Sequence, residues 1–330
     1  MKRKRRTNLE RSQDSVAYVP DAVLKNRTNI SNRSEYLDKF YARMFIEDVK
    51  LGIMPFGGRT SKNQFLVSLE PSNSEAQQIV EAALSPGEYR NGLTSEVCDF
   101  VAQCAVELLL FDTSTYEIVY LSEEEAGKLV GFEFVRINPI TLFRRGNVLR
   151  QVLPDELATK LGKPGYTEFK PERILVFKLP TNIQGKIGPL MKSLAVLSPP
   201  TMPDFFMNEL ASGSRDTPYD AKAHIHMHKV ALANATKLFG WNARLMVLGE
   251  SLEYYFVHRS LLFEQFKIEL RETILETLNE GVNRAGGQLG FQAQIRVTGL
   301  PSMIDVSTAF DHLQKGDIPF VDILEPFRGY

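Results

Sequence analysis

Apolar residues recur at helical spacing in three stretches of the first third of the chain, residues 35–51, 74–84 and 94–110. The third stretch has the longest stripe, made of Val97, Val101, Cys104, Ala105 and Leu108. The expected N-caps are Ser72 or Ser74 for the second stretch and Thr94 or Ser95 for the third. The pattern predicts three helices that follow a polar arm.

From residue 112 the pattern becomes typical of β-strands. Polar and apolar residues alternate over residues 131–139, which predicts a half-buried strand. Two further apolar segments, 116–121 and 173–179, are also predicted strands. Arg144-Arg145-Gly146-Asn147 is typical of a turn between two short strands. We therefore expect residues 112–180 to form a small mixed sheet with short turns.

The last third of the chain is predicted to be mostly helical. Thr217 and Pro218 are a favourable helix start, and this helix should end near Phe239, before Gly240. The longest helical signal covers residues 253–280, with Gly281 as its expected end. A strand at 292–297 and a short helix at 307–314 should follow, while Gly286-Gly287 and Gly57-Gly58 are interpreted as turn glycines. Together these elements predict an α+β protein.

Composition agrees with a folded protein rather than a disordered chain. The 330 residues are 43% hydrophobic and 24% charged, which is enough for a sizeable core. Residues 1–50 carry twelve Lys and Arg against seven Asp and Glu, although the whole chain has a formal charge of −1. Five of the basic residues are Lys2, Arg3, Lys4, Arg5 and Arg6. This tip would hold phosphates weakly, but a solvated, flexible terminus is the favoured interpretation.

Segments for export or membrane insertion are not expected. The basic start leads into polar residues rather than an apolar run, and no stretch approaches 18 consecutive apolar residues. The two cysteines, Cys98 and Cys104, lie in an apolar stretch and match neither a disulfide framework nor a metal pattern. They are interpreted as two small buried hydrophobic residues in a reducing compartment.

Three closely spaced histidines, His224, His226 and His228, are the strongest candidate for metal chemistry. On a strand all three would share a face, whereas on a helix His226 points nearly opposite to the other two. The local pattern is helical, which favours surface or subunit-contact histidines over a zinc site. Nucleophile-elbow and phosphate-loop motifs are absent from the sequence, so we expect no enzyme and no cofactor.

A basic stripe lies in the same predicted helix. Lys222, Lys229 and Lys237 are spaced so that they share one side of a helix, and Arg244 follows in the next loop. Such a stripe would touch DNA phosphates without reading sequence if the helix lined a channel. An ordinary solvated helix face is the alternative.

The order of these elements resembles the portal proteins of tailed bacteriophages. An apolar helix, a β-hairpin and the segments FVRINPITLFRR (134–145) and KPERILVFKLP (170–180) are similar to the wing region of that family. GKIGPLMKSLA (185–195) looks like the family's glycine-proline turn and following helix. Residues 257–283 resemble the long helix that crosses the ring, and MIDVSTAFDHLQKGDIPFVDI (303–323) resembles the family's ending. The resemblance covers about residues 90–325 and includes no invariant chemical motif.

The sequence also departs from the family pattern. The chain is short for the family, and a clip domain is not obvious; it would have to fit within residues 200–216 or 241–256. Little room remains for a helical crown before Tyr330. The resemblance implies four regions: a flexible basic arm (1–34), a wing-like α+β domain (35–198), a stem/clip-like helical region (199–256), and a long helix, short strand and C-terminal helix (257–330).

The resemblance implies a dodecameric portal ring in the virion, at one vertex of the capsid. The ring would serve as the channel for packaging and ejecting double-stranded DNA and as the attachment point for the tail. The implied partners are other copies of the chain, the major capsid protein, the terminase large subunit, the head–tail adaptor and non-specifically bound DNA, with no membrane. Alternatives are another connector or minor capsid protein, a metal-dependent enzyme using His224, His226 and His228, or a nucleic-acid-binding protein that uses its basic N-terminus.

Overall fold

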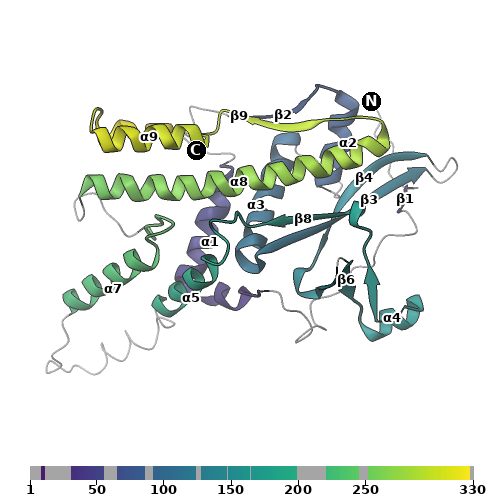
Figure 1. The fold of residues 1–330 in the computed structure, drawn as a ribbon, viewed down its shortest axis with the longest axis horizontal. Helices are drawn as coiled ribbons and strands as arrows, with labels where there is room; N and C mark the ends of the chain where they lie inside the picture. The colour runs from purple at the N-terminus through teal and green to yellow at the C-terminus, as the bar shows by residue number, and fades with distance from the viewer. Residues whose placement is uncertain are drawn as a thin grey trace. The chain divides into compact units, whose positions relative to one another are not determined.

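The computed structural model describes residues 9–11, 31–55, 65–85, 92–123, 128–146, 148–163, 165–198, 221–244 and 252–327. The predicted α+β class is confirmed, with helices alongside small sheets (Figure 1). The chain forms two compact units. Unit 1 comprises residues 1–32, 53–180 and 270–300, and unit 2 comprises residues 33–52, 181–269 and 301–330. The four regions implied by the resemblance divide the chain differently and stay a prediction.

The main sheet of unit 1 is built around the long strand β3 (Thr113–Glu123). β4 (Leu129–Ile137) pairs with β3 on one side, and β1 (Leu9–Arg11) and β8 (Ile174–Lys178) pair with its two ends. All three pairings are antiparallel, so the expectation of a mixed sheet was wrong: hairpin connections produce antiparallel neighbours. Part of the N-terminal arm is therefore a strand, since Leu9 pairs with Glu123.

Strand β4 differs from its predicted half-buried form. Residues 131–134 are all buried, so both faces of the strand are covered over this stretch. The reason is tertiary, because helix α2 (Ser74–Leu84) packs on β4. Alternating polar and apolar residues along a strand indicate a solvent-exposed face only where no other element packs on that face.

Two smaller sheets complete unit 1. β5 (Leu142–Arg145), β6 (Val148–Val152) and β7 (Tyr166–Glu168) form an antiparallel sheet beside the short helix α4 (Asp155–Leu161). The predicted turn at Arg144 to Asn147 is confirmed for its described residues, which connect β5 to β6. β2 (Leu66–Glu70) pairs with β9 (Gln294–Thr298) across more than 200 residues of sequence. Sequence patterns missed β2 and β7, which are short and depend on their partners.

Helices α2 and α3 (Leu93–Phe111) confirm two of the predicted helices, but their N-caps differ. The side chain of Asn73 accepts hydrogen bonds from two amides at the start of α2, and Gly92 precedes α3. Cys98 and Cys104 are buried in α3, as predicted. Burial, with a smaller effect of Asp99, raises the pKa of the Cys98 thiol to about 12.

The long helix α8 (Glu253–Leu289) passes through three glycines that had been assigned to a helix end or to turns. A Cβ at Gly281 would lie 2.6 Å from Cδ2 of Leu175, and one at Gly286 would lie 2.7 Å from the ring and carbonyl of Phe291. These two glycines therefore permit close packing. Gly287 has open space around it, and Gly57-Gly58 lies outside the described residues.

Unit 2 is helical in its described part. Its main elements are α1 (Phe40–Ile53, whose last residue belongs to unit 1), α5 (Ile187–Leu197), α7 (Ala221–Ala235), residues 253–269 of α8, α9 (Met303–Lys315) and α10 (Phe320–Ile323). The predicted helix at 35–51 is interrupted: a 3₁₀ turn, η2 (Ser34–Asp38), precedes α1, with extended backbone at Lys39. Short 3₁₀ turns also occur in unit 1 at η3 (Pro139–Thr141) and η4 (Pro171–Arg173), and in unit 2 at η5 (Glu325–Phe327).

Two apolar clusters hold unit 2 together. One is aromatic, with Phe45 at its centre and ring centroids of Phe239, Trp241, Phe263 and Phe266 at 5.5–6.3 Å from it. The other joins Val257 and Leu261 of α8 to the buried faces of α9 and α10. No helix in the described part of the chain combines the length and the apolarity needed to cross a membrane.

Candidate functional site

Helix α7 carries most of the sequence-predicted functional residues. The helical conformation is confirmed for residues 221–235, but the helix ends at Ala235 rather than near Phe239. The amides of Phe239 and Gly240 both bond to the carbonyl of Thr236, which closes a turn there. Lys237 therefore lies beyond the helix and is exposed, while Lys229 is half-buried within it. Lys222 lies in the first turn of α7, and its side chain is outside the description.

The turn after α7 fits tightly against α8. Gly240 has a φ of 68°, and a Cβ there would lie 2.7 Å from Cβ of Leu262 and even closer to the carbonyl of Arg259. Only glycine suits this position, because an added side chain would be both strained and obstructed. The next residue, Trp241, is 1% exposed, which is typical of an aromatic side chain that anchors the packing of a turn.

Asp48 of α1 links the turn to the rest of unit 2. Its carboxylate accepts a hydrogen bond from Trp241 Nε1 at 2.9 Å and one from Arg244 Nε at 3.0 Å, and Arg244 also forms an ion pair with it. The hydrogen bond to Asp48 and the negative charge of Asp48 raise the pKa of the Arg244 guanidinium. Arg244, predicted to contact a DNA channel, is therefore joined to a carboxylate of its own chain.

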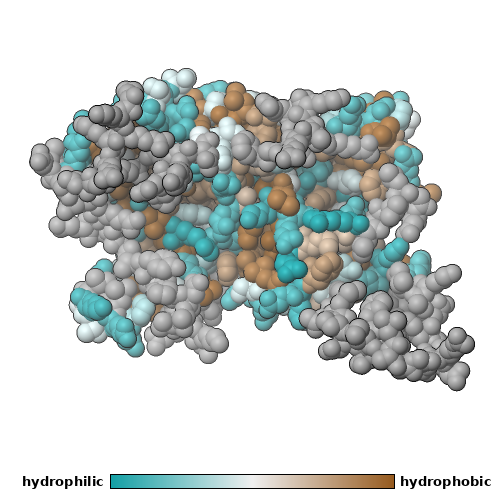
Figure 2. Space-filling view, turned by 180° about the vertical axis from the view of Figure 1, so that it is seen from behind, coloured by the Kyte–Doolittle hydropathy of each residue, from teal (hydrophilic) through white to brown (hydrophobic). Residues whose placement is uncertain are grey.

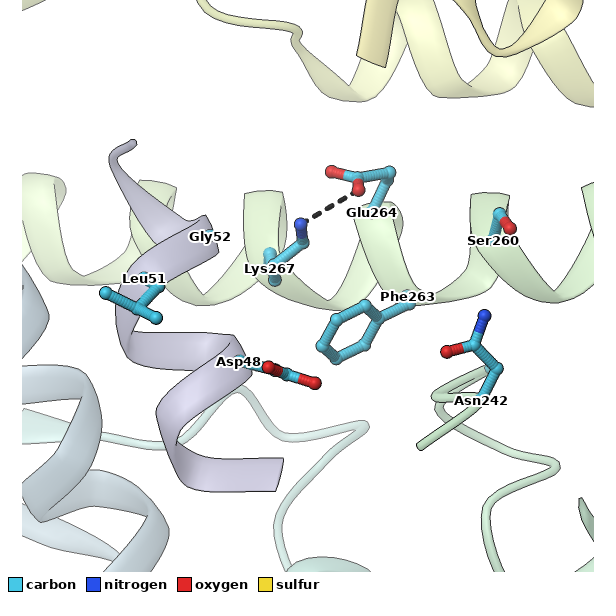
Figure 3. A pocket seen from close by; sticks show the side chains of 9 residues that line it. Asp48, Leu51, Gly52, Asn242, Ser260, Phe263, Glu264 and Lys267 are labelled. Carbon is cyan, nitrogen blue, oxygen red and sulfur yellow. Dashed lines mark hydrogen bonds and ion pairs between the residues drawn. The ribbon is translucent and has the colours of Figure 1, made fainter. Parts of the chain in front are cut away.

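A polar pocket of about 390 Å³ opens beside Asp48. Figure 3 shows that α1, α8 and the loop with Asn242 surround it. Lys267 Nζ lies 2.8 Å from Glu264 Oε1 and 5.0 Å from the ring centroid of Phe263. The lysine side chain packs against α1 at Gly52, where a Cβ would lie 2.9 Å from Nζ. The pocket thus contains a satisfied ion pair on an aromatic ring.

Arg259 is the most deeply buried cation near this site, with 2% exposure, and sequence analysis missed it. Its guanidinium donates to the carbonyl of Ala233 at 3.0 Å, to Thr236 Oγ1 at 2.6 Å and to the carbonyl of Trp241 at 2.5 Å. Among the described residues it has no carboxylate within ion-pair distance, and its Nε has no hydrogen-bond partner. The acceptors at the C-terminal end of α7 supply the compensating negative partial charge. The position of Arg259 in the helical pattern of α8 does not indicate that its side chain is buried against α7.

The histidine triplet lies in α7, so the strand geometry that would align all three imidazoles does not occur. His226 is exposed, whereas His228 Nε2 lies 2.9 Å from the carbonyl of Leu197 and its ring lies 5.6 Å from that of Tyr41. The side chain of His224 is outside the description. Within the described side chains, no three His, Cys, Asp or Glu residues are grouped to hold a metal ion.

The predicted site residues therefore divide into separate environments. Arg244 faces Asp48, His228 faces α5, and Lys237 faces solvent. Of the predicted residues only Arg244 lies in the cluster that the structure brings together, which also contains Asp48, Trp241, Glu264 and Lys267. Most of these side chains are already paired within the chain, which is typical of a structural joint between helices.

Comparison with known proteins gives little further information. No protein-family model matches the chain, and no curated protein matches it. A chain from the solved structure of the virion of a native gene transfer agent particle is similar over 86% of this chain and 89% of that chain, with 12% sequence identity and a TM-score of 0.47. Because this TM-score lies below 0.5, we draw no conclusion on function from the likeness.

Proposed function

We propose that the chain is the subunit of a portal ring in a phage-like virion, with a structural rather than an enzymatic role. The ring would stand at one capsid vertex and conduct double-stranded DNA during packaging and ejection. Support comes from the order of elements, in which α3, the strands β3 to β8, α5, the long helix α8, β9 and α9 follow one another as the resemblance implies.

The observation that carries the proposal is the distribution of exposed apolar side chains. Eleven of the twelve large exposed hydrophobic residues among the described residues belong to unit 2. Leu252, Ile304 and Val196 are the most exposed, at 81%, 78% and 76%. Single exposed hydrophobic residues are ordinary, but such a concentration in one unit is typical of a surface that a partner covers. A closed ring needs two complementary faces on each subunit, and unit 2 offers candidates for them.

Figure 2 shows hydrophobic residues interspersed with hydrophilic ones on the face it draws. A mixed surface suits a large assembly whose subunits contact one another and several other proteins. The proposed partners are further copies of this chain in a dodecamer, the major capsid protein, the terminase large subunit and the head–tail adaptor.

The proposed DNA contacts are Lys222, Lys229 and Lys237, with Arg244 as a weaker candidate because Asp48 engages it. Contacts of this kind act through charge and lose affinity as salt rises. A conduit should hold DNA weakly, which agrees with the formal charge of −1 and with scattered rather than massed basic residues.

Native mass spectrometry with negative-stain imaging of the full-length protein tests this function. We expect rings with a central opening that admits a duplex. Ile304→Asp should weaken ring formation, because it charges an apolar position in α9 where a first-turn carboxylate is otherwise tolerated. Leu66→Asp, an exposed apolar position of unit 1, is the matched control. A wild-type protein that stays monomeric at its highest soluble concentration contradicts the proposal.

The metal-enzyme alternative is separated by His226→Ala. Because His226 is exposed and lies away from His228 on α7, this change should leave ring formation and stability unaltered. A three-histidine metal site would instead lose its bound metal, measured by elemental analysis of the purified protein.

A further inference from the structure

The three-stranded sheet β5–β6–β7 of unit 1, together with α4, carries a net positive charge, unlike the chain as a whole. Residues 142–170 contain six Lys and Arg and three Asp and Glu, a balance of +3, whereas the whole chain has a formal charge of −1. The remaining residues therefore sum to −4. The surplus of positive charge lies on one small element of known geometry.

The strand register divides the side chains of this sheet between two faces. Leu142 pairs with Gln151, and both are buried, with Leu142 and Leu149 in a cluster with Ile137 and Phe169. Arg144 pairs with Leu149 and shares this face. Side chains alternate between faces, so Phe143, Arg145, Val148 and Arg150 point the other way, where Phe143 packs against Val152 and Ala158. Arg144 and Arg145 are both exposed at the tip of the hairpin.

Basic and aromatic side chains are interleaved on the face that carries Arg150, whose side chain is 14% exposed. The guanidinium of Arg150 lies 4.6 Å from the ring centroid of Tyr166, and this ring contacts that of Phe143 at 6.3 Å. One end of the Arg150 guanidinium lies 2.5 Å from Glu168 Oε1, and its Nε is buried without a hydrogen-bond partner. Tyr166 and Glu168 therefore hold Arg150 flat on the sheet, next to the arginine tip.

We propose that the tip of the β5–β6 hairpin, with the adjoining Arg150–Tyr166 pair, is a second DNA-binding surface, which contacts the phosphodiester backbone without reading base sequence. Arg144 and Arg145 supply the main phosphate contacts, and the Arg150–Tyr166 pair forms a rigid floor beside them. The choice of duplex DNA as ligand rests on the proposed function; the surface itself is distinct from the channel residues proposed on α7 and in the loop after it.

Physical chemistry favours a phosphate backbone as the ligand. Arginine presents a planar fork of donors that matches two phosphate oxygens, and its charge persists at all physiological pH values. A hairpin tip with two adjacent arginines that point to opposite faces can contact neighbouring phosphates of a groove. Aromatic side chains between basic ones are typical of nucleic-acid surfaces, since they stiffen the arginines at low entropic cost.

The test measures binding of the full-length protein to a fluorescently labelled linear duplex of random sequence over a range of salt concentrations. Replacing Arg144 and Arg145 together by Gln should weaken binding by roughly tenfold or more at low salt, and should make the salt dependence of log K shallower by about 2, because each phosphate contact contributes about 0.9. Glu168→Gln should act in the opposite direction and tighten binding, because it removes a carboxylate that competes for Arg150.

The matched control replaces Lys39 and Lys192 by Gln, which removes two positive charges from exposed positions of unit 2. It should leave binding close to wild type. Equal losses in the arginine variant and the control would overturn the proposal, because net charge alone would explain them. So would unchanged binding in the arginine variant, or a wild-type protein that ignores DNA and binds an acidic peptide instead.

Ring formation of the same variants is imaged in parallel. If the arginine variant forms intact rings and binds DNA as wild type does, the second surface is rejected and the portal function is kept. If the protein forms no rings but the arginine variant still loses DNA binding, the portal function is rejected and the second surface is kept. Circular dichroism shows whether each variant is folded.

Discussion

The two compact units bury charged side chains in different ways. In unit 1, Glu107 is 1% exposed and forms an ion pair with Arg136, with further hydrogen bonds from Ser114 at 2.6 Å and Gln103 at 3.0 Å. In unit 2, Arg259 is 2% exposed and donates hydrogen bonds to two carbonyls and to two hydroxyls. A paired carboxylate joins α3 to β3 and β4, whereas an arginine joins the C-terminal end of α7 to α8.

The difference shows what each unit relies on. The ion pair of Glu107 reaches Arg136, whose side chain is 49% exposed, so water screens part of the attraction. The side chain of Arg259 is not accessible to water. Its hydrogen bonds therefore depend on α7 and Trp241 remaining in place. We therefore expect substitutions of Arg259 to disrupt the packing of α7 as a whole, whereas substitutions in the hydrogen-bond network of Glu107 should have smaller effects.

The largest effect is expected for Arg259→Ala. This change removes the donor to the buried hydroxyl of Thr236, the buried carbonyl of Trp241 and the half-buried carbonyl of Ala233, which should lower the free energy of unfolding by roughly 3 kcal/mol or more. Urea unfolding followed by Trp241 fluorescence measures it. Arg259→Lys keeps the charge but loses the planar set of guanidinium donors. An effect as large as that of alanine would show that hydrogen-bond geometry outweighs charge. A loss below about 1 kcal/mol for alanine would contradict the role given to Arg259.

A smaller effect is expected for Glu107→Gln. The side chain keeps its shape and one acceptor oxygen, so the loss is mainly the ion pair to a half-exposed arginine. We expect a decrease of about 1–2 kcal/mol in the free energy of unfolding. Circular dichroism during denaturation measures it, and a loss equal to that of Arg259→Ala would remove the contrast between the units.

Adjacent glycines of α8 provide an internal comparison within unit 1. Gly286→Ala should destabilise by about 1–2 kcal/mol, because the new Cβ would lie 2.7 Å from Phe291 and overpacking outweighs the gain in helix propensity. Gly287→Ala meets open space and should stabilise by up to about 1 kcal/mol. Thermal unfolding of both variants checks the two signs; equal signs would show that the helix is not packed here as described.

The smallest effect concerns the surface pair of His312 and Asp317 in unit 2, whose Nδ1 and Oδ1 atoms lie 2.8 Å apart. The hydrogen bond from His312 is the main reason that the pKa of Asp317 is lowered in the folded protein. A lowered pKa stabilises the fold at neutral pH, and this contribution is lost as the pH falls through the lowered value. NMR titration of Asp317 should show the low pKa, and His312→Ala should move it upward; an unchanged titration would contradict the pairing.

Local patterns predicted much of the fold. The stripe in α3, the apolar segment in β3, and the long signal of α8 depend on residues close in sequence, and all three elements are present. The turn at Arg144 and the helical form of the histidine segment were also predicted, for the same reason. Propensity and periodicity act over a few residues, so they are readable from the chain alone.

The candidate site was predicted less well. Asp48 and Trp241 are 193 residues apart, and no spacing rule connects them. The lysines and histidines singled out from sequence spacing occupy different environments, and Arg259 resembled any other charged residue of a long helix. Gly281 was assigned to a helix end because glycine often ends helices, whereas its packing against Leu175 explains its presence.

The sequence by itself determined the class of the protein, most of its helices and strands, and the concentration of charge in particular segments. The tertiary structure alone decided which strands pair, why particular glycines occupy α8, and which partners Glu107, Arg244 and Arg259 have. The physical reason is range: hydrophobic periodicity is set by the residues of one element, whereas hydrogen bonds, ion pairs and close approaches depend on elements that folding brings together from distant parts of the chain.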